Sequence, residues 1–180
     1  MRVIAGSLGG RRFKAPPGRT TRPTSDRVRE ALFAMLGEIE GDRVMDLFAG
    51  SGALGIEALS RGALTAVFVE RDARAARVLA ENLSLLGLGE DRAEIRRGEA
   101  LTALGRARER QETYDLLLID PPYQMAGEMR EVLAEIVPPL LSSGARVAIE
   151  SDRRTPLQLG LEVERERRYG DTCITIHRHP

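Results

Sequence analysis

The stretch DLFAGSGALG at positions 46–55 joins a short apolar segment to the start of an amphipathic one. Its three glycines, Gly50, Gly52 and Gly55, satisfy the pattern G-x-G-x-x-G. Glycines in such a turn let the chain bend tightly and let a ligand approach the backbone closely. Glu70 stands 20 residues after Gly50, at the end of the next apolar segment, where its carboxylate can accept hydrogen bonds from both hydroxyls of a ribose. The pattern therefore predicts a site for an adenosine-containing cofactor.

Apolar strands and amphipathic helices alternate along the rest of the chain. The spacing of apolar residues predicts strands at 43–48, 65–70, 92–96, 114–119 and 145–149, with helices at 55–61, 73–86, 100–107 and 127–137 between them. Residues 161–169 and 172–177 then predict a hairpin that turns at Gly170 and Asp171. Repeated βα units closed by an antiparallel hairpin predict an α/β protein with a doubly wound, mostly parallel sheet.

The first 22 residues are rich in glycine, proline and basic side chains, and they predict an extension before the α/β domain at 23–180. Residues 3–5 and 12–14 can form a short hairpin across Gly9 and Gly10, and the remainder is expected to be an extended arm. Thr24 is the expected N-cap of a helix that ends at Gly37 or Gly41.

Composition limits the classes of protein to which the chain can belong. Its 180 residues suit one domain, and a single cysteine excludes both an intramolecular disulfide and a cysteine-rich zinc site. No apolar run is long enough for a membrane span, and the amino terminus lacks a secretory signal, so we expect a cytoplasmic protein. Cys173 is expected to be buried, and His177 and His179 lack a third ligand, so no metal site is expected.

Charge is distributed unevenly although the net charge is zero. Residues 1–30 hold eight basic and two acidic side chains, so the other residues carry a net charge of −6. A basic extension on an acidic body suits contact with the phosphates of a nucleic acid. The candidate phosphate-binding residues are Arg11, Arg12, Lys14, Arg19 and Arg22.

A second motif, Asp120-Pro121-Pro122-Tyr123, directly follows the apolar strand at 114–119. In an open α/β sheet, ligands bind outside the carboxyl ends of strands at the point where the strand order reverses. Asp46 and Asp120 end two strands that are neighbours across this point, so we expect the motif to face the glycine turn.

The chemistry of this tetrapeptide suits methylation of an exocyclic amine on a nucleic-acid base. Such an amine is a poor nucleophile because its lone pair is delocalised into the ring. Asp120 can accept one N–H and the carbonyl of Pro121 the other, which localises the lone pair. Pro122 stiffens the loop, and Tyr123 offers a ring on which the base stacks, for roughly 1–3 kcal/mol.

Two cofactors, NAD and S-adenosylmethionine, suit the glycine turn, and three features favour S-adenosylmethionine. Asp46 can meet an ammonium group or a ribose, whereas it would repel a pyrophosphate. Gly98-Glu99-Ala100 follows the third strand and places a carboxylate where the adenine amino group can donate to it. The Asp120 motif is the third feature and the strongest one.

The residues also resemble a known family. DLFAGSG at 46–52 and DPPY at 120–123 are similar to the amino-methyltransferase superfamily. RPTSDRVREALF at 22–33, with RVIAG at 2–6 and GRR at 10–12, closely resembles the bacterial small-subunit ribosomal RNA guanine-N2 methyltransferases. The resemblance runs from residue 2 to the terminal hairpin.

The resemblance implies a class I methyltransferase domain at 23–180, with a seven-stranded Rossmann-like sheet whose last strand is antiparallel. It implies methylation of one guanine in a hairpin loop of 16S ribosomal RNA, presented on an assembling small subunit, and we expect the protein to be a monomer. Carried over by position, Asp120, Pro121, Pro122 and Tyr123 would hold the amine. The cofactor would be held by Asp46, Gly50, Ser51, Gly52, Glu70, Arg71, Gly98, Glu99, Ala100, Thr24 and Arg27. The family often has Asp or Asn at position 99, where this chain has Glu.

Two other functions fit the same motifs. A DNA adenine or cytosine amino-methyltransferase would use Asp120-Pro121-Pro122-Tyr123 equally well, although such enzymes usually carry an added target-recognition domain. An RNA-binding assembly factor whose methylation is incidental would also keep an intact site. A nicotinamide dehydrogenase is the third and most distant alternative.

Overall fold

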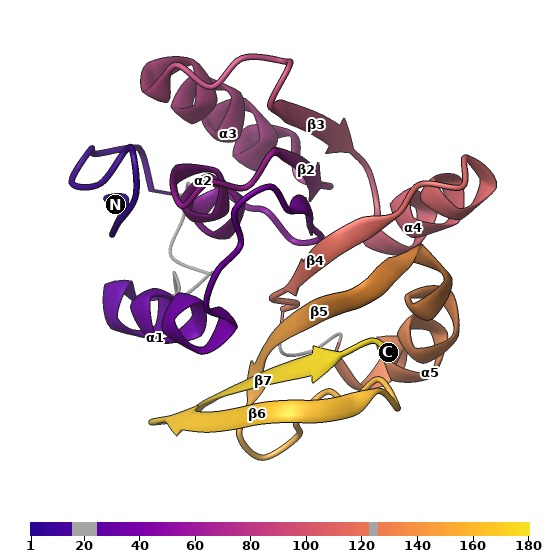
Figure 1. Ribbon diagram of the computed structural model, residues 1–180. Helices are drawn as coiled ribbons and strands as arrows, with labels where there is room; N and C mark the ends of the chain where they lie inside the picture. Colours follow the sequence, from indigo (N-terminus) through magenta and orange to yellow (C-terminus); the bar gives the residue numbers. More distant parts are fainter. Residues whose placement is uncertain (16–24, 123–125) are drawn as a thin grey trace.

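A computed structural model describes residues 1–15, 25–122 and 126–180 of the chain. Its centre is a seven-stranded sheet in the order β3-β2-β1-β4-β5-β7-β6 (Figure 1). The strands are β1 (Arg43–Asp46), β2 (Thr65–Glu70), β3 (Ala93–Arg97), β4 (Tyr114–Ile119), β5 (Leu141–Asp152), β6 (Glu162–Tyr169) and β7 (Thr172–Arg178). Strands β1 to β5 run parallel, whereas β7 runs antiparallel to its neighbours β5 and β6. The predicted doubly wound sheet with its antiparallel last strand is confirmed.

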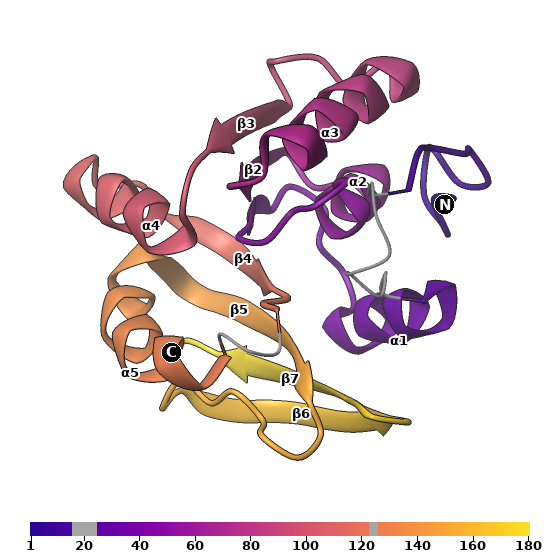
Figure 2. The same cartoon turned by 180° about the vertical axis from the view of Figure 1, so that it is seen from behind.

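Helices cover both faces of this sheet. They are α1 (Asp26–Leu36), α2 (Ala53–Ser60), α3 (Ala73–Leu86), α4 (Ala100–Glu109) and α5 (Ala126–Ile136), with a short 3-10 helix at Pro138–Leu140. Figures 1 and 2 show the placement of these helices around the sheet. Helices α1, α2 and α3 share one buried apolar cluster, and α4 and α5 share the other. No helix of the described residues is both long and apolar enough to cross a membrane.

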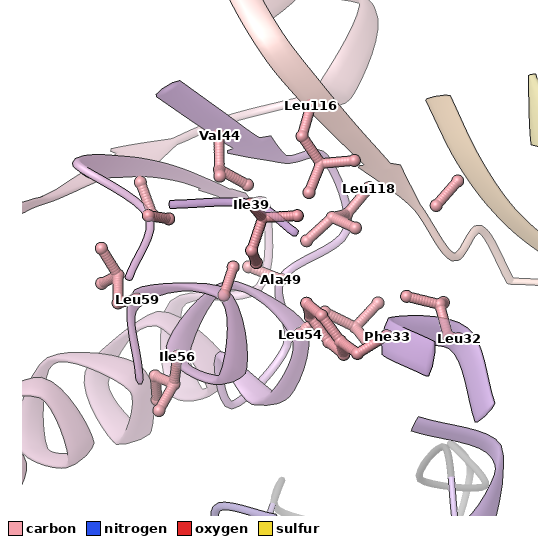
Figure 3. Close-up of a cluster of buried hydrophobic side chains, with 14 of the residues drawn as sticks. Leu32, Phe33, Ile39, Val44, Ala49, Leu54, Ile56, Leu59, Leu116 and Leu118 are labelled. Carbon is pink, nitrogen blue, oxygen red and sulfur yellow. The ribbon is translucent and has the colours of Figure 1, made fainter. Parts of the chain in front are cut away.

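Strand β4 shows why the core strands are almost continuously apolar. Leu116 and Leu118 point into the α1–α3 cluster, which Figure 3 shows, while Leu117 and Ile119 point into the α4–α5 cluster. All four side chains are buried, and each contributes roughly 1.5–3 kcal/mol by leaving water. A strand covered on both faces needs apolar residues at successive positions rather than at alternate ones.

Strand β5 begins earlier than its apolar run predicts. The expected strand was 145–149, but pairing already starts between Leu141 and Tyr114, ahead of a register shift. The intervening Ser142, Ser143 and Gly144 are partly or fully exposed. Polar residues in a strand give no periodic apolar signal, so this extension depends on the neighbouring β4.

Helix α1 begins one residue later than the sequence predicts. Ser25 is its N-cap, with a side-chain oxygen that accepts from the backbone N–H of Val28 at 3.2 Å. Thr24, the expected cap, lies outside the described residues. The helix ends at Gly37, as one of the two predicted stops.

The first 15 residues, which we call the N-terminal segment, pack against the domain instead of extending from it. The expected short hairpin forms with shifted partners: an antiparallel bridge joins Arg2 to Arg12, and backbone hydrogen bonds link Val3 with Gly10 and Arg11, and Met1 with Phe13. Val3 and Phe13 are buried in the α1–α3 cluster, which explains why the segment lies on the body.

Candidate functional site

The candidate site lies at the carboxyl ends of β1 and β4. Asp46, the last residue of β1, is in register with Leu118 of β4, and Asp120 directly follows that strand. The chain continues from β1 to β2 on one side and reaches β4 on the other, so this is the switch point of the sheet. The structure thus brings together two aspartates that are far apart in the sequence.

Asp46 is buried next to two other carboxylates. Its Oδ2 accepts from the backbone N–H of Gly55 at 3.0 Å, and the backbone N–H of Phe48 also faces the carboxylate, while its Oδ1 has no partner in good hydrogen-bond geometry. Burial, and then the nearby charges of Asp120 and Glu70, raise the pKa of Asp46 to about 7. The negative charge of these carboxylates and the available acceptor on Asp46 suit a ligand that carries positive charge and N–H donors.

The glycine loop, residues 49–55, has two glycines that close packing requires and one beside open space. A Cβ on Gly52, where φ is +91°, would lie 2.4 Å from Cδ1 of Leu79. A Cβ on Gly55 would lie 2.3 Å from Cε1 of Phe68. A Cβ on Gly50 would meet nothing within 4 Å, although its φ is +55°. Gly52 and Gly55 seat the loop on the domain, and Gly50 leaves room for a ligand.

Glu70 shapes this loop through two backbone contacts. Its Oε2 accepts from the N–H of Gly50 at 2.8 Å, and its Oε1 accepts from the N–H of Asp72 at 2.7 Å. Each carboxylate oxygen can accept a further hydrogen bond. Glu70 therefore holds the loop through its backbone, and its oxygens retain the capacity to accept hydrogen bonds from hydroxyl donors.

Glu99 and Arg71 come together at the neighbouring strand ends. Glu99 is the N-cap residue of α4, and its Oε1 lies 3.6 Å from Nη1 of Arg71, with both side chains more than half exposed. Gly98 donates its N–H to the carbonyl of Glu70 at 3.0 Å, which ties the two turns together, and Ala100 is buried.

A pocket of about 190 Å³ lies beside β3 and α4. Gly98 and Glu99 belong both to its lining and to the expected cofactor residues. The remaining lining residues are Glu94, Arg96, Arg97, Thr102, Ala103, Arg106 and Arg110. The pocket therefore adjoins the third-strand turn rather than the glycine loop.

The second motif is described only in part. Asp120 is partly exposed, Pro121 is buried and Pro122 is exposed, whereas Tyr123 lies outside the described residues. Arg27 is exposed on the first turn of α1.

The candidate phosphate-binding residues differ in how they are used. Arg11 donates to the carbonyls of Leu85 and Leu86 at 2.7 and 2.9 Å, where it caps the carboxyl end of α3. Lys14 is exposed and pairs with Glu81 at 2.6 Å. Arg12 is exposed, while Arg19 and Arg22 lie outside the described residues.

Sequence reasoning missed a buried ionic cluster beneath the N-terminal segment. Glu57, fully buried on α2, accepts from the N–H groups of Ile4 and Ala5 at 2.7 and 3.1 Å and from Arg61 Nε at 2.8 Å. Arg29, counted among the eight basic side chains of residues 1–30, is also fully buried, with Nε 3.7 Å from Glu57. The available signal was a glutamate in the otherwise apolar run of α2.

The carboxyl-terminal strand holds its cysteine and a histidine in the core. Cys173 is buried and free, as expected. His177 is buried, with Nδ1 3.1 Å from the carbonyl of Leu161, and burial lowers its pKa. Among the described residues, no cluster of three His, Cys, Asp or Glu side chains could hold a metal ion.

Comparison with known proteins places this architecture in a family. The family model described as "Conserved hypothetical protein 95" matches residues 1–178. The protein YlbH of Bacillus subtilis is 40% identical, over 99% of this chain and 98% of its own. "Ribosomal RNA small subunit methyltransferase D" of Haemophilus influenzae is 34% identical, over 87% and 81%. The protein of the same name from Escherichia coli is 38% identical, over 69% of this chain and 61% of its own.

Solved structures agree with this relationship. The yhhF protein of Escherichia coli has a TM-score of 0.83 at 31% identity, over 99% of this chain and 97% of its own. A Thermus protein, TTHA0928, has a TM-score of 0.84 at 31% identity, over 99% of both chains. An RNA methyltransferase of Salinibacter ruber, solved with S-adenosyl-L-homocysteine, has a TM-score of 0.65 at 22% identity, over 88% and 94%, and shares the fold.

Proposed function

Because the chain belongs to the family of ribosomal RNA small subunit methyltransferase D, we propose that it transfers a methyl group from S-adenosylmethionine to ribosomal RNA. The proposed acceptor is the exocyclic N2 amine of one guanine in a loop of 16S ribosomal RNA, presented on the assembling small subunit. The observation that carries the proposal is the meeting of Asp46 with Asp120 at the switch point of the sheet.

The residues present fit this cofactor by their charge. S-adenosylmethionine supplies a methyl group activated by a positively charged sulfur, and its methionine end carries an ammonium group. Asp46 has a buried Oδ1 without a partner, and like charges surround it, so a cationic ligand would relieve that repulsion. A pyrophosphate cofactor would add negative charge at the same place.

In this proposal the cofactor would be held by residues at the carboxyl ends of three strands. Gly50, Ser51 and Gly52 would contact it from the glycine loop, and Glu70 would accept hydrogen bonds from its ribose. Around the adenine end, the proposed contacts come from Gly98, Glu99, Ala100 and Arg71. Thr24 and Arg27 are proposed to approach the methionine end.

Asp120 and Pro121 are proposed to accept the two N–H groups of the target amine. Acceptors outside the base plane draw the nitrogen toward tetrahedral geometry and localise its lone pair. Pro122 restricts the loop, and Tyr123 would stack on the base. Because the sulfonium is a strong electrophile, positioning supplies much of the rate without a strongly basic group.

The RNA would be positioned by phosphate contacts that do not read its sequence. Arg12 and Lys14 are exposed and so are available for such contacts, together with the proposed Arg19 and Arg22. Arg11 contributes less directly, because it is bonded to the end of α3. Unpaired loop bases can be splayed out and read on their edges, which suits a hairpin target.

Methyl transfer from labelled S-adenosylmethionine tests the proposal. Naked 16S ribosomal RNA and partially assembled small subunits are compared as substrates, and the labelled nucleoside is identified. We expect N2-methylguanine in one loop. Label in adenine or cytosine of DNA, with none in either ribosomal substrate, would keep the site and overturn the substrate.

A further inference from the structure

Helix α3 buries a single polar side chain, Asn82, among apolar ones. Its Nδ2 donates to the carbonyl of Ser51 at 2.9 Å and to the carbonyl of Lys14 at 3.1 Å. Its Oδ1 accepts from the N–H of Lys14 at 2.8 Å. One amide group thus joins the glycine loop to the N-terminal segment, and both of its N–H donors are used.

The contact with Ser51 adds to a second contact between α3 and the same loop. Leu79, one turn before Asn82, fills the space in which a side chain at Gly52 would lie. Ser51 is itself buried, and its hydroxyl lies 3.7 Å from Sδ of Met1. Helix α3 therefore supports the glycine loop through packing at Gly52 and through a hydrogen bond at Ser51.

The N-terminal segment is held on the domain mainly through its backbone. Besides the Glu57 contacts, Ser60 Oγ accepts from the N–H of Leu8 at 3.0 Å and donates to the carbonyl of Ala5 at 2.5 Å. Gly6 lies so close to α2 that a Cβ there would be 1.9 Å from the carbonyl oxygen of Ser60. Figure 1 shows the segment beside α2. At Lys14, the side chain of Asn82 bonds both the backbone N–H and the backbone carbonyl, and so holds this end of the segment on α3.

We propose that Asn82 is a positioning residue that couples the N-terminal segment to the cofactor loop, an inference that relies on the proposed function for the identity of the cofactor. The same amide of Asn82 bonds the Ser51 carbonyl and the Lys14 backbone. A ligand that binds the loop in this conformation therefore also favours the state in which the N-terminal segment is docked at Lys14. By linkage, RNA that contacts the docked segment favours the binding-competent loop to the same extent. Removing the amide of Asn82 lowers the fraction of protein whose loop is in the cofactor-binding conformation. The apparent Kd for the cofactor rises as this fraction falls.

Asn82→Ala tests the coupling, with S-adenosylhomocysteine as the probe. We expect its Kd and the KM for S-adenosylmethionine to rise by about 10-fold, with kcat within about 2-fold at saturation. Asn82→Asp keeps an acceptor for Lys14 but sets a carboxylate against the carbonyl of Ser51, so it should bind no better than the alanine variant. Glu81→Gln is the matched control, because it removes the exposed ion pair with Lys14 and leaves the amide contacts in place.

Two results would overturn this role. One is an Asn82→Ala protein with wild-type Kd and KM and only a lower Tm, since that is a purely structural effect. The other comes from the unaltered protein and does not depend on any variant folding. Saturating S-adenosylhomocysteine should slow hydrogen exchange of the Lys14 amide, and an unchanged rate contradicts the coupling. An unaltered chain that binds no S-adenosylhomocysteine would overturn the proposed cofactor and the coupling with it.

Discussion

Asp46 concentrates the electrostatics of the candidate site in one side chain. Its carboxylate is buried, one oxygen lacks a partner, and Asp120 and Glu70 lie near enough to raise its pKa. A buried acid with an unsatisfied oxygen costs stability in its charged form. The ionised form of Asp46 is therefore destabilised in the folded chain, and a cationic ligand bound beside it would stabilise that form.

The raised pKa of Asp46 predicts that the free energy of unfolding depends on pH. The pKa of Asp46 is about 7 in the folded chain and near 3.8 when unfolded, so its contribution is full below about pH 4 and is lost as the pH rises through 7. For Asp46→Asn without ligand, we expect a smaller fall in Tm between pH 5 and pH 8 than for the unaltered chain. The difference between the two thermal-denaturation curves isolates Asp46 from other titrating groups. Parallel curves would contradict the raised pKa.

Asp120 should affect catalysis more than cofactor binding. Removing one of the two acceptors of the target amine in Asp120→Ala should lower kcat by about 100-fold or more, by analogy with the loss of one preorganised hydrogen bond. Asp115→Ala is the control, because Asp115 is a carboxylate on β4, the strand that precedes Asp120, and it accepts from the Arg43 N–H and the Ser142 hydroxyl. Single-turnover methyl transfer and S-adenosylhomocysteine affinity are measured for both. If Asp120→Ala and Asp115→Ala lowered kcat equally, the proposed contact between Asp120 and the target amine would be contradicted.

At the scale of elements, the glycine loop and α3 fit together through Gly52. Its φ of +91° is unfavourable for any side chain, and the Cβ position is already occupied by Leu79. A side chain at position 52 would therefore lower the free energy of unfolding in two ways, through the unfavourable backbone conformation and through the close contact with Leu79. Gly87, the C-cap of α3, has a φ of +73° but nothing within 4 Å of its Cβ position. A side chain at position 87 would therefore meet only the unfavourable backbone conformation.

Gly52→Ala should therefore destabilise the chain more than Gly87→Ala. Both variants place alanine in a left-handed conformation, at a cost of roughly 1–2 kcal/mol. Only Gly52→Ala must also displace the buried side-chain ends of Leu79 and Ile56, so it should add about 1–3 kcal/mol and weaken S-adenosylhomocysteine binding. Urea denaturation and calorimetry measure the two effects. Equal free energies of unfolding for the two variants would show that the contact relaxes without cost.

At the scale of the whole molecule, the basic side chains that the structure describes within residues 1–30 fall into two groups, one used inside the protein and one exposed. Part of the positive charge of residues 1–30 is used inside the protein, since Arg29 is buried beside Glu57 and Arg11 caps α3. Arg12 and Lys14 remain exposed on the N-terminal segment. The number of cations available to RNA is therefore smaller than the sequence count suggests.

Neutralising Arg12 and Lys14 together should reduce the salt dependence of RNA binding. Each lost phosphate contact lowers the slope of log K against log salt by about 0.7–0.9, so the double glutamine variant should lose about 1.5. Binding to 16S ribosomal RNA is titrated at several salt concentrations. Arg167→Gln with Arg168→Gln, on the exposed edge strand β6, is the control and should leave the slope unchanged. An unchanged slope in the first variant would exclude the segment from the RNA interface.

The sequence by itself predicted the bounds of β2, β4 and α3, because their apolar periodicity and caps are local features. It also predicted that Asp46 and Asp120 meet, because parallel strands place their carboxyl ends at one edge. Only the tertiary structure decided that Glu57 and Asn82 hold the N-terminal segment and that Arg29 is buried. Their partners lie far away in the sequence, up to 68 residues for Asn82. A polar side chain alone does not show whether water or a distant backbone group satisfies it, and burial decides between the two.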